Sequence, residues 1–447
     1  MIASKSEPVD LTAVPPVARE VDVCAPPVLG ALPPELDGTF LTIGPNPLRR
    51  PRDEHLFAGD GMVHGLRLRD GRAEWYRNRW LRTDRAARIL GELPAPGPRH
   101  GPNDNANANI VRHAGRTLAL GDGGPRPLQL DARLDTVARV DFDGTLPGGF
   151  AAHPQHDPLT GELHAVAMSH EPPYAAYLVV DVHGRVRRSV PVPLKRPVMM
   201  HAFSLTERHA LVYDLPVVFS PAAAAAGSRV PYAWNDGHGA RLGLLPRDGG
   251  PDDILWVELP PCFVFHPVNA YETGRHIVVD VIRHPRVFDR DPHRPGETPP
   301  ALVRWTVDAV GGTVVEEQLS DAVQESPVID DRVRGMRHRF AFTTALDPSG
   351  GELLGGPALL RHDLAAGRTD THALPPGRTA GEAVFVPREP CAPEGDGWLL
   401  SMVTDGRTGR GELMVLDTAD FTGRPAAVVP LPVPVPHGFH AAWVDGG

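Results

Sequence analysis

Short apolar runs separated by turn-forming residues recur along the whole chain. No long stretch keeps the three-to-four-residue spacing of apolar positions that marks an amphipathic helix. Many short strands joined by turns are typical of an all-β protein. The composition agrees, because 46 Gly and 50 Pro leave few positions for long helices.

One pattern recurs seven times: an apolar strand, an aspartate, a small or polar turn and a second strand. Aspartate suits this place because its carboxylate can accept hydrogen bonds from backbone N–H groups two residues further on. The turn aspartates follow one another at intervals of 50 to 67 residues and are Asp70, Asp131, Asp181, Asp248, Asp308, Asp363 and Asp417. Seven such units predict an all-β, seven-bladed β-propeller with long loops on one face. A pair of β-sandwiches is the competing architecture, but it does not account for seven recurrences.

The ends of the chain predict how the ring closes. The last unit lacks outer strands after its turn, because the chain ends at Gly447. We expect strands near Met62–Arg77 to complete the blade that holds Phe439–Val444. Residues 1–447 would then form a single propeller domain, with the N-terminal 35 residues or so as an extended segment packed on it.

The charge and cysteine content exclude several classes of protein. The formal net charge is −10, whereas nucleic-acid-binding proteins usually carry a basic balance. The three cysteines, Cys24, Cys262 and Cys391, are too few and too widely spaced for a disulfide framework or a thiolate zinc site. The N-terminal residues show no signal-peptide core, so the expected location is the cytoplasm, and no obligate protein partner is predicted.

Four histidines occupy similar places in their repeats, 18 to 23 residues after the preceding turn aspartate: His153, His201, His266 and His440. If these places lie on the innermost strands, the imidazoles converge on the propeller axis. Glu325 and Glu382 take the corresponding places in two other units. Imidazoles without a thiolate suit Fe, Zn, Cu or Ni, and carboxylates can fix their tautomers. The alternative is that each histidine is a hydrogen-bonded structural residue of its strand.

The segments around these residues resemble the carotenoid cleavage oxygenase family over nearly the whole chain. Near the N-terminus, GTFLTIGPNP and FAGDGMVHGLRL match the opening pattern of the family. FAAHPQHDPLTGEL, MMHAFSLTERHALVYDLP, FVFHPVNAYE and PHGFHAAWV resemble its four iron-ligand segments. They place the ligands at His153 (rather than His156), His201, His266 and His440 (rather than His437). Four motifs in this order are highly specific.

The resemblance implies a propeller with a dome of loops and helices over an axial Fe(II). It also implies three carboxylates that hydrogen-bond three of the histidines. ESPVIDDRVRGMRHRFAF and GEAVFVPR place two of them at Glu325 and Glu382. The third falls in TLALGDGG, where Asp122 replaces the usual glutamate. Because aspartate is one methylene shorter, its contact with the histidine must lengthen, involve water or come with a backbone shift.

The activity implied by the resemblance is cleavage of a C=C bond with O₂ as co-substrate, giving two carbonyl products. No general acid or base is required, so Asp60 and His64 are interpreted as turn and packing residues. A phenolic branch of the family, which cleaves stilbenes or phenylpropenes, typically carries a lysine directly before the first carboxylate. This chain has Gly121 there, and its two lysines are Lys5 and Lys195. A carotenoid or apocarotenoid is therefore the favoured substrate; the alternatives are a phenolic alkene, isomerisation without O₂, or a non-catalytic propeller that binds a partner.

A hydrophobic polyene must be drawn from a membrane or a carrier. The segment Leu215–Trp234 is apolar and contains one charged residue, Arg229. Shallow contact of this segment with a membrane is one interpretation. Packing of its apolar side chains on the propeller is the other.

Overall fold

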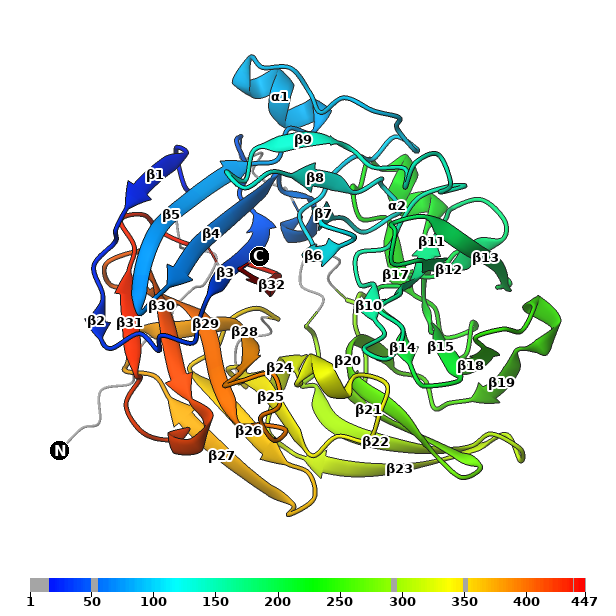
Figure 1. Ribbon diagram of the computed structural model, residues 1–447. Helices are drawn as coiled ribbons and strands as arrows, with labels where there is room; N and C mark the ends of the chain where they lie inside the picture. The colour runs from blue at the N-terminus through cyan, green and yellow to red at the C-terminus, as the bar shows by residue number, and fades with distance from the viewer. Residues whose placement is uncertain (1–15, 50–54, 291–295, 349–352, 437, 447) are drawn as a thin grey trace.

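Seven antiparallel sheets stand radially around a central axis in the computed structural model, which describes residues 16–49, 55–290, 296–348, 353–436 and 438–446 (Figure 1). Each sheet has four or five strands and forms one blade. The predicted seven-bladed propeller is therefore confirmed, and the sandwich alternative is excluded.

The blades are numbered here in chain order, and their strands are given from the axis outward. Blade 1 consists of β32 (His440–Asp445), β3 (Gly38–Pro45), β4 (Gly61–Arg69), β5 (Arg72–Trp80) and β1 (Val21–Cys24). Blade 2 consists of β6 (Asn109–His113), β7 (Arg116–Leu120), β8 (Leu128–Leu130) and β9 (Thr136–Arg139). Blade 3 consists of β10 (Gln155–His156), β11 (Leu163–Met168), β12 (Tyr174–Val180) and β13 (Val186–Pro193).

Blades 4 to 7 follow the same plan. Blade 4 consists of β14 (Ser204–Leu205), β15 (His209–Asp214), β18 (Arg241–Pro246) and β19 (Leu255–Glu258). Blade 5 consists of β20 (Phe263–Thr273), β21 (His276–His284), β22 (Ala301–Asp308) and β23 (Thr313–Ser320). Blade 6 consists of β24 (Gln324–Val328), β25 (Phe340–Ala345), β26 (Ala358–Asp363) and β27 (Arg368–Ala373). Blade 7 consists of β28 (Arg378–Pro387), β29 (Gly397–Asp405), β30 (Arg410–Asp417), β31 (Ala427–Pro430) and β2 (Leu29–Gly30).

The burial of each strand follows from its place in the blade. A middle strand is covered on both faces by neighbouring blades, so every residue of β11 and of β29 is buried. An outer strand such as β13 alternates instead between more buried and more exposed positions, because one of its faces meets solvent. These two patterns are the short apolar runs and the alternating runs of the sequence.

The turn aspartates all lie between the third and the fourth strand of a blade. Asp70 separates β4 from β5, for example, and Asp417 ends β30 just before β31. Five of the seven accept hydrogen bonds from backbone N–H groups two to four residues further on: Asp131, Asp181, Asp308, Asp363 and Asp417. The repeated aspartate thus fixes the tight outer turn of the blade.

Blade 1 closes the ring with strands from both ends of the chain. The C-terminal β32 pairs with β3, from Gly38 opposite Asp445 to Ile43 opposite His440. Strand β3 then pairs with β4, and β4 with β5. Strands near Met62–Arg77 therefore complete the blade that holds Phe439–Val444, as expected, and β3 lies between them.

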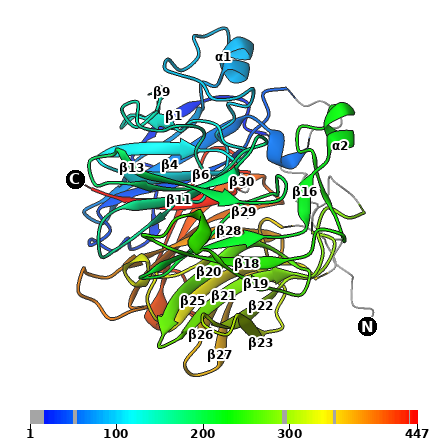
Figure 2. The same cartoon turned by 90° about the vertical axis from the view of Figure 1, so that its right-hand side faces the viewer.

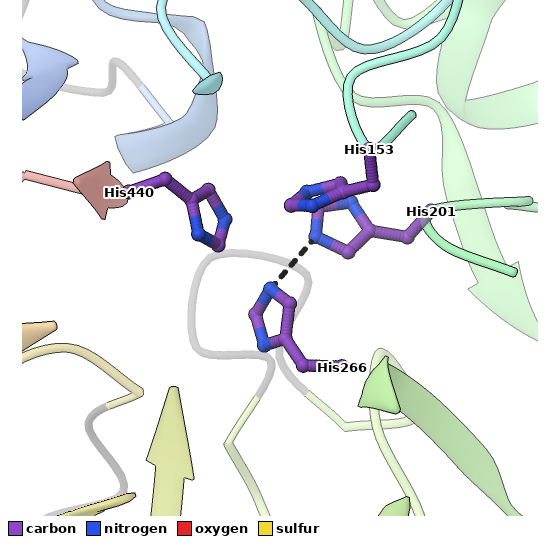
Figure 3. Close-up of side chains that lie close together, drawn as sticks. All are labelled: His153, His201, His266 and His440. Carbon is purple, nitrogen blue, oxygen red and sulfur yellow. Dashed lines mark hydrogen bonds between the residues drawn. The ribbon is translucent and has the colours of Figure 1, made fainter. Parts of the chain in front are cut away.

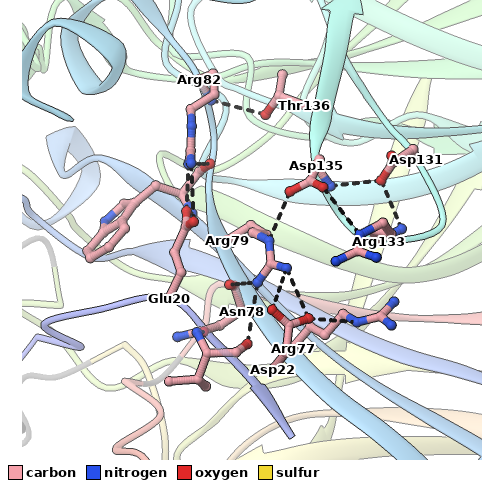
Figure 4. Close-up of polar contacts among 12 residues, drawn as sticks. Glu20, Asp22, Arg77, Asn78, Arg79, Arg82, Asp131, Arg133, Asp135 and Thr136 are labelled. Carbon is pink, nitrogen blue, oxygen red and sulfur yellow. Dashed lines mark hydrogen bonds and ion pairs between the residues drawn. The ribbon is translucent and has the colours of Figure 1, made fainter. Parts of the chain in front are cut away.

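The N-terminal segment closes the ring a second time at its outer edge. Strand β1 pairs with β5 of blade 1, and β2 pairs with β31 of blade 7. Arg79 on β5 reinforces this contact: its guanidinium bonds both carboxylate oxygens of Asp22 on β1 and one of Asp135, before β9 (Figure 4). The neighbouring Arg82 binds Glu20 in the same way. Residues 1–15 of the predicted segment lie outside the described residues.

Long connections between strands gather on one face of the ring, as Figure 2 shows for the hairpin strand β16 and helix α2. The hairpin pairs β16 (Val217–Phe219) with β17 (Tyr232–Trp234), and α2 (Pro221–Ala225) lies between them. Helix α1 (Asp84–Leu90) lies in the connection from blade 1 to blade 2. The described 3₁₀ turns are η2 (Leu56–Ala58), η3 (Pro251–Asp253), η4 (Asp331–Val333) and η5 (Thr418–Asp420). Among the described residues, no helix is long and apolar enough to cross a membrane.

Substitution of Arg79 by methionine tests the outer closure. The Arg79 side chain is 7 % exposed, whereas its two partner carboxylates are about half exposed and can be rehydrated. We expect a loss of about 1–3 kcal/mol in the free energy of unfolding, measured by urea denaturation. Arg133→Met is the matched control, because Arg133 is mostly exposed and lies 3.8 Å from the same Asp135. Equal effects of the two substitutions would contradict this account.

Candidate metal centre

Four imidazoles from four different blades converge on the propeller axis (Figure 3). His440 is the first residue of β32, and His266 lies in β20. His153 and His201 lie in the loops that lead into β10 and β14, the innermost strands of blades 3 and 4. The four histidines occupy equivalent positions in the sequence repeat, and they lie at the same end of the innermost strands.

The four ligand nitrogens lie within 4.8 Å of one another. The closest pair of rings, His153 and His201, has its centroids 4.3 Å apart, and His201 Nε2 lies 3.2 Å from His266 Nε2. Two nitrogens bound at right angles to one metal, each about 2.1 Å away, would be separated by about 3.0 Å. The cluster thus has nearly the dimensions of a coordination sphere.

Irregularities in the innermost strands aim three of the side chains at the axis. The pairing of β20 with β21 shifts register between Val264 and Pro267, around His266. Similar shifts lie next to Glu325 in β24 and around Glu382 in β28. Ser326, which follows Glu325, has a positive φ of 54°, an unusual conformation for a residue other than glycine. Such bulges redirect side chains and are common beside functional sites.

Two buried carboxylates hold two of the imidazoles. His266 donates from Nδ1 to Glu325 Oε2 at 2.7 Å, and His440 donates from Nδ1 to Glu382 Oε1 at 3.0 Å. Backbone N–H groups bind the same carboxylates, from Ser326 to Glu325 and from Ala441 to Glu382. These contacts leave the Nε2 lone pairs of both histidines directed at the axis.

Asp122, just beyond β7, approaches the third imidazole. Its Oδ2 lies 3.0 Å from His201 Nδ1, so the shorter side chain still reaches the ring. Its other oxygen, Oδ1, is buried and has no hydrogen-bond partner among the described residues. Glu325, by contrast, uses both oxygens, because His284 Nε2 donates to Oε1 at 2.8 Å. Asp122 thus holds its histidine through one oxygen alone.

The electrostatics of the cluster favour a cation at its centre. Burial lowers the pKa of His153 and of His266, so both rings are neutral at pH 7. Burial also disfavours the charged form of Glu325, but His266 and His284 outweigh it and hold the Glu325 pKa well below its usual range. Burial opposes protonation of His440 too, yet Glu382, Asp122 and Glu325 outweigh it and raise its pKa. The anionic carboxylate of Glu325 thus lies beside the neutral rings of His153 and His266.

His153 supplies a second buried polar atom of the site without a partner. Its Nε2 is buried and forms no hydrogen bond with any of the described residues. A buried nitrogen without a partner is costly in a protein interior, and neighbouring lone pairs that face one another add to the cost. A divalent ion bound by the four nitrogens would remove both penalties. The residues present therefore fit a metal ion with histidine ligands.

A largely apolar cavity of about 490 Å³ lies against the histidines, on the face of the ring where the long connections gather. This face is called the dome face here. The cavity is called the dome cavity; its lining includes Phe57, Met199, Tyr232, Phe265, Leu354 and Phe439. The Phe57 ring packs edge-on against Phe439 at 5.6 Å and against Phe265 at 6.4 Å between centroids. Phe265 in turn packs against His201 at 5.6 Å. These three phenylalanines, the phenylalanine collar, form an apolar rim beside the metal ligands.

Several other residues considered in the sequence analysis do not belong to the four-histidine cluster. His64 is buried and pairs with the Tyr76 hydroxyl, and Asp60 is buried against Arg85, so their interpretation as packing residues agrees with the structure. His156 pairs with His113 rather than with the four histidines, and His437 lies outside the described residues. His284 was missed, because only the fold reveals that β21 brings it to Glu325.

Comparison with known proteins agrees with this geometry. Residues 14–445 match the family described as retinal pigment epithelial membrane protein. The chain is 40 % identical to the carotenoid cleavage oxygenase of Mycobacterium tuberculosis, over 96 % of this chain and 95 % of that protein. The structure of Pseudomonas brassicacearum lignostilbene dioxygenase superposes with a TM-score of 0.88 at 26 % identity, covering 96 % of this chain and 97 % of that one. A Synechocystis apocarotenoid oxygenase variant gives 0.84 at 27 % identity, covering 98 % of each chain.

The chain is a seven-bladed propeller with four histidines on its axis that could hold a metal ion, and its named relatives are oxygenases. Among oxygenases, it belongs to the carotenoid cleavage oxygenase family. It is an enzyme of the dioxygenase type, as its named relatives are oxygenases, and the non-catalytic alternative is set aside.

Substitution of Glu325 by glutamine tests the coupling of carboxylate and imidazole. His266 and His284 donate to different oxygens of Glu325, and a glutamine replaces one of these oxygens with an NH₂ donor, so one of the two hydrogen bonds is lost. We expect affinity for Co²⁺, titrated by visible absorption, to fall roughly 10–100-fold. Glu317→Gln, an exposed carboxylate on β23, is the control and should leave affinity unchanged. Equal affinity in both variants would show that Glu325 does not orient the ligand.

Proposed function

We propose that this enzyme is a non-haem Fe(II)-dependent dioxygenase that cleaves one C=C bond of a carotenoid or apocarotenoid with O₂, giving two carbonyl products. The observation that carries the proposal is the convergence of four imidazole nitrogens at the wall of an apolar cavity. In the proposal, His153, His201, His266 and His440 hold the iron, and Asp122, Glu325 and Glu382 orient the last three of these ligands. A bound ferrous ion would supply the redox chemistry that allows O₂ to react with an alkene.

The chain itself contributes a dry, shaped space beside the ligands. In the proposal, the phenylalanine collar limits the access of water beside the ligands and packs against a flat polyene. The amide groups of Asn105 and Asn107 both donate to the Gly59 carbonyl, which ties two connections of the cavity wall together. Alkene cleavage requires no proton transfer by a side chain, which is consistent with Asp60 being paired with Arg85 in this wall.

The surroundings of Gly121 support a polyene over a phenol. A side chain at this position would place its Cβ 1.9 Å from the carbonyl oxygen of Asn105. The place where the phenolic branch carries a lysine is therefore filled by backbone. Lys195 is exposed and does not line the dome cavity, and Lys5 lies outside the described residues. The likeness to the lignostilbene enzyme keeps a phenolic alkene as the second candidate substrate.

An aerobic incubation of iron-loaded protein with a panel of candidate substrates tests this function. The panel contains carotenes, apocarotenals of several lengths and hydroxystilbenes. We expect new aldehydes or ketones from a polyene, detected by LC–MS, and none without O₂ or in His201→Ala. His183→Ala, an exposed histidine in an outer turn, is the matched control and should remain active. Cleavage of hydroxystilbenes alone would overturn the substrate class. An isomerised polyene without O₂ consumption would overturn the reaction.

The proposal includes shallow contact of Leu215–Trp234 with a lipid surface, through small side chains. Leu215, Val217 and Tyr232 are buried, so the exposed part of this segment is the alanine-rich helix α2 and the residues after it, up to Arg229. We expect the unmodified protein to co-float with vesicles, and the double substitution Ala222→Asp and Ala225→Asp to reduce the floated fraction several-fold. No flotation of the unmodified protein would remove membrane contact from the proposal.

A further inference from the structure

The four histidines separate two cavities. The dome cavity is lined by His201, His266 and His440. A second cavity of about 1020 Å³, called the axial cavity here, is lined by His153, His266 and His440. Two ligands thus face both cavities, and His153 and His201 each face one, so a metal ion held by all four would be reachable from either side.

The axial cavity follows the innermost strands away from the dome. Its lining includes residues of β6, β24, β28 and β32, which stand around the axis (Figure 1). The histidines lie at the beginning of the innermost strands, whereas this cavity extends to the ends of β28 and β32, at Pro387 and Asp445. It therefore leads from the metal site to the face of the propeller opposite the dome.

The walls of the axial cavity carry many charged groups, and the acidic ones outnumber the basic ones. Seven carboxylates line it, against four guanidinium groups, Arg112, Arg332, Arg334 and Arg388. The carboxylates are Glu35, Asp37, Asp330, Asp331, Glu382, Glu389 and Asp445. His113 and His156 add a pair of imidazoles, and burial lowers the pKa of both, so they are neutral donors and acceptors at pH 7. Such a wall attracts cations and can replace part of their hydration.

The dome cavity is the more apolar of the two, although the carboxylates of Asp60, Asp104, Asp122 and Glu325 and the guanidinium groups of Arg85 and Arg229 also line it. A hydrated ion that approached the ligands from there would meet the phenylalanine collar, in which the Phe57 ring lies 5.6 Å from Phe439 and 6.4 Å from Phe265. Transfer of an ion from water into apolar surroundings carries a large penalty when no polar group compensates it. The more apolar route suits the polyene, and the route with more charged groups suits an ion.

From these contrasts we propose that the axial cavity is the route by which the metal ion reaches and leaves the four-histidine site. This inference rests on the proposed function in one respect, namely that the four histidines bind iron. Substrate and metal then use opposite faces of the ring, so a polyene seated in the dome cavity does not block exchange of the metal.

The test uses tryptophan substitutions that narrow one cavity at a time. The measured quantity is the rate at which the hydrophilic chelator ferrozine removes Fe(II) from the iron-loaded protein. Val384 on β28 is half-buried and lines the axial cavity. We expect Val384→Trp to slow iron loss roughly tenfold, equivalent to about 1.4 kcal/mol on the barrier. Its iron content at equilibrium should stay unchanged. Val111→Trp, on β6, narrows the same cavity from another blade and serves if the first variant does not fold.

Leu354→Trp is the matched control, because Leu354 lines the dome cavity but not the axial cavity. It should reduce polyene turnover and leave the rate of iron loss unchanged. The proposed route would be overturned if Leu354→Trp slowed iron loss while Val384→Trp and Val111→Trp did not. It would also be overturned if all three variants lost iron at the normal rate. Failure of the unmodified protein to retain iron would instead overturn the proposed function, before any rates are compared.

Discussion

Repulsion between converging imidazole lone pairs is the constraint on which the structure depends. Carboxylates accept from the Nδ1 of His266 and His440, so the Nε2 lone pairs of these rings are directed at one point on the axis. His153 brings a further buried nitrogen that has no partner among the described residues. Imidazole nitrogens held within 4.8 Å of one another are stable together when a cation lies between them. The closed ring of seven blades supplies the rigidity that this arrangement requires.

The ring gives each of its two faces a different chemistry. Long connections between strands build an apolar dome cavity on one face, and the ends of the innermost strands build a polar axial cavity toward the other. The histidines lie where the two meet. The double closure of the ring, by β32 on the inside and by β1 and β2 on the outside, keeps blades 1 and 7 from separating around this centre. Arg79 and Arg82 stabilise the outer closure through their carboxylate pairs.

Local rules made much of the fold predictable from the sequence. The aspartate of each outer turn, such as Asp308, accepts backbone hydrogen bonds close to itself in the chain, so the repeat is visible in the sequence. The same repeat placed His440, and the family resemblance implied that Glu382 bonds one of the histidines. His284 was missed because its bond to Glu325 spans 41 residues and has no local signal. The phenylalanine collar was missed because Phe57, Phe265 and Phe439 come from separate connections that only the closed ring brings together.

X-ray absorption spectroscopy of the Fe(II)-loaded protein tests the central claim most directly. Multiple scattering from imidazole rings counts the histidines bound to the metal independently of any substrate. Four imidazoles per iron, with one iron per chain, is the result that this structure predicts. Two or fewer imidazoles, or a sulfur ligand, would show that the converging histidines do not form the metal centre.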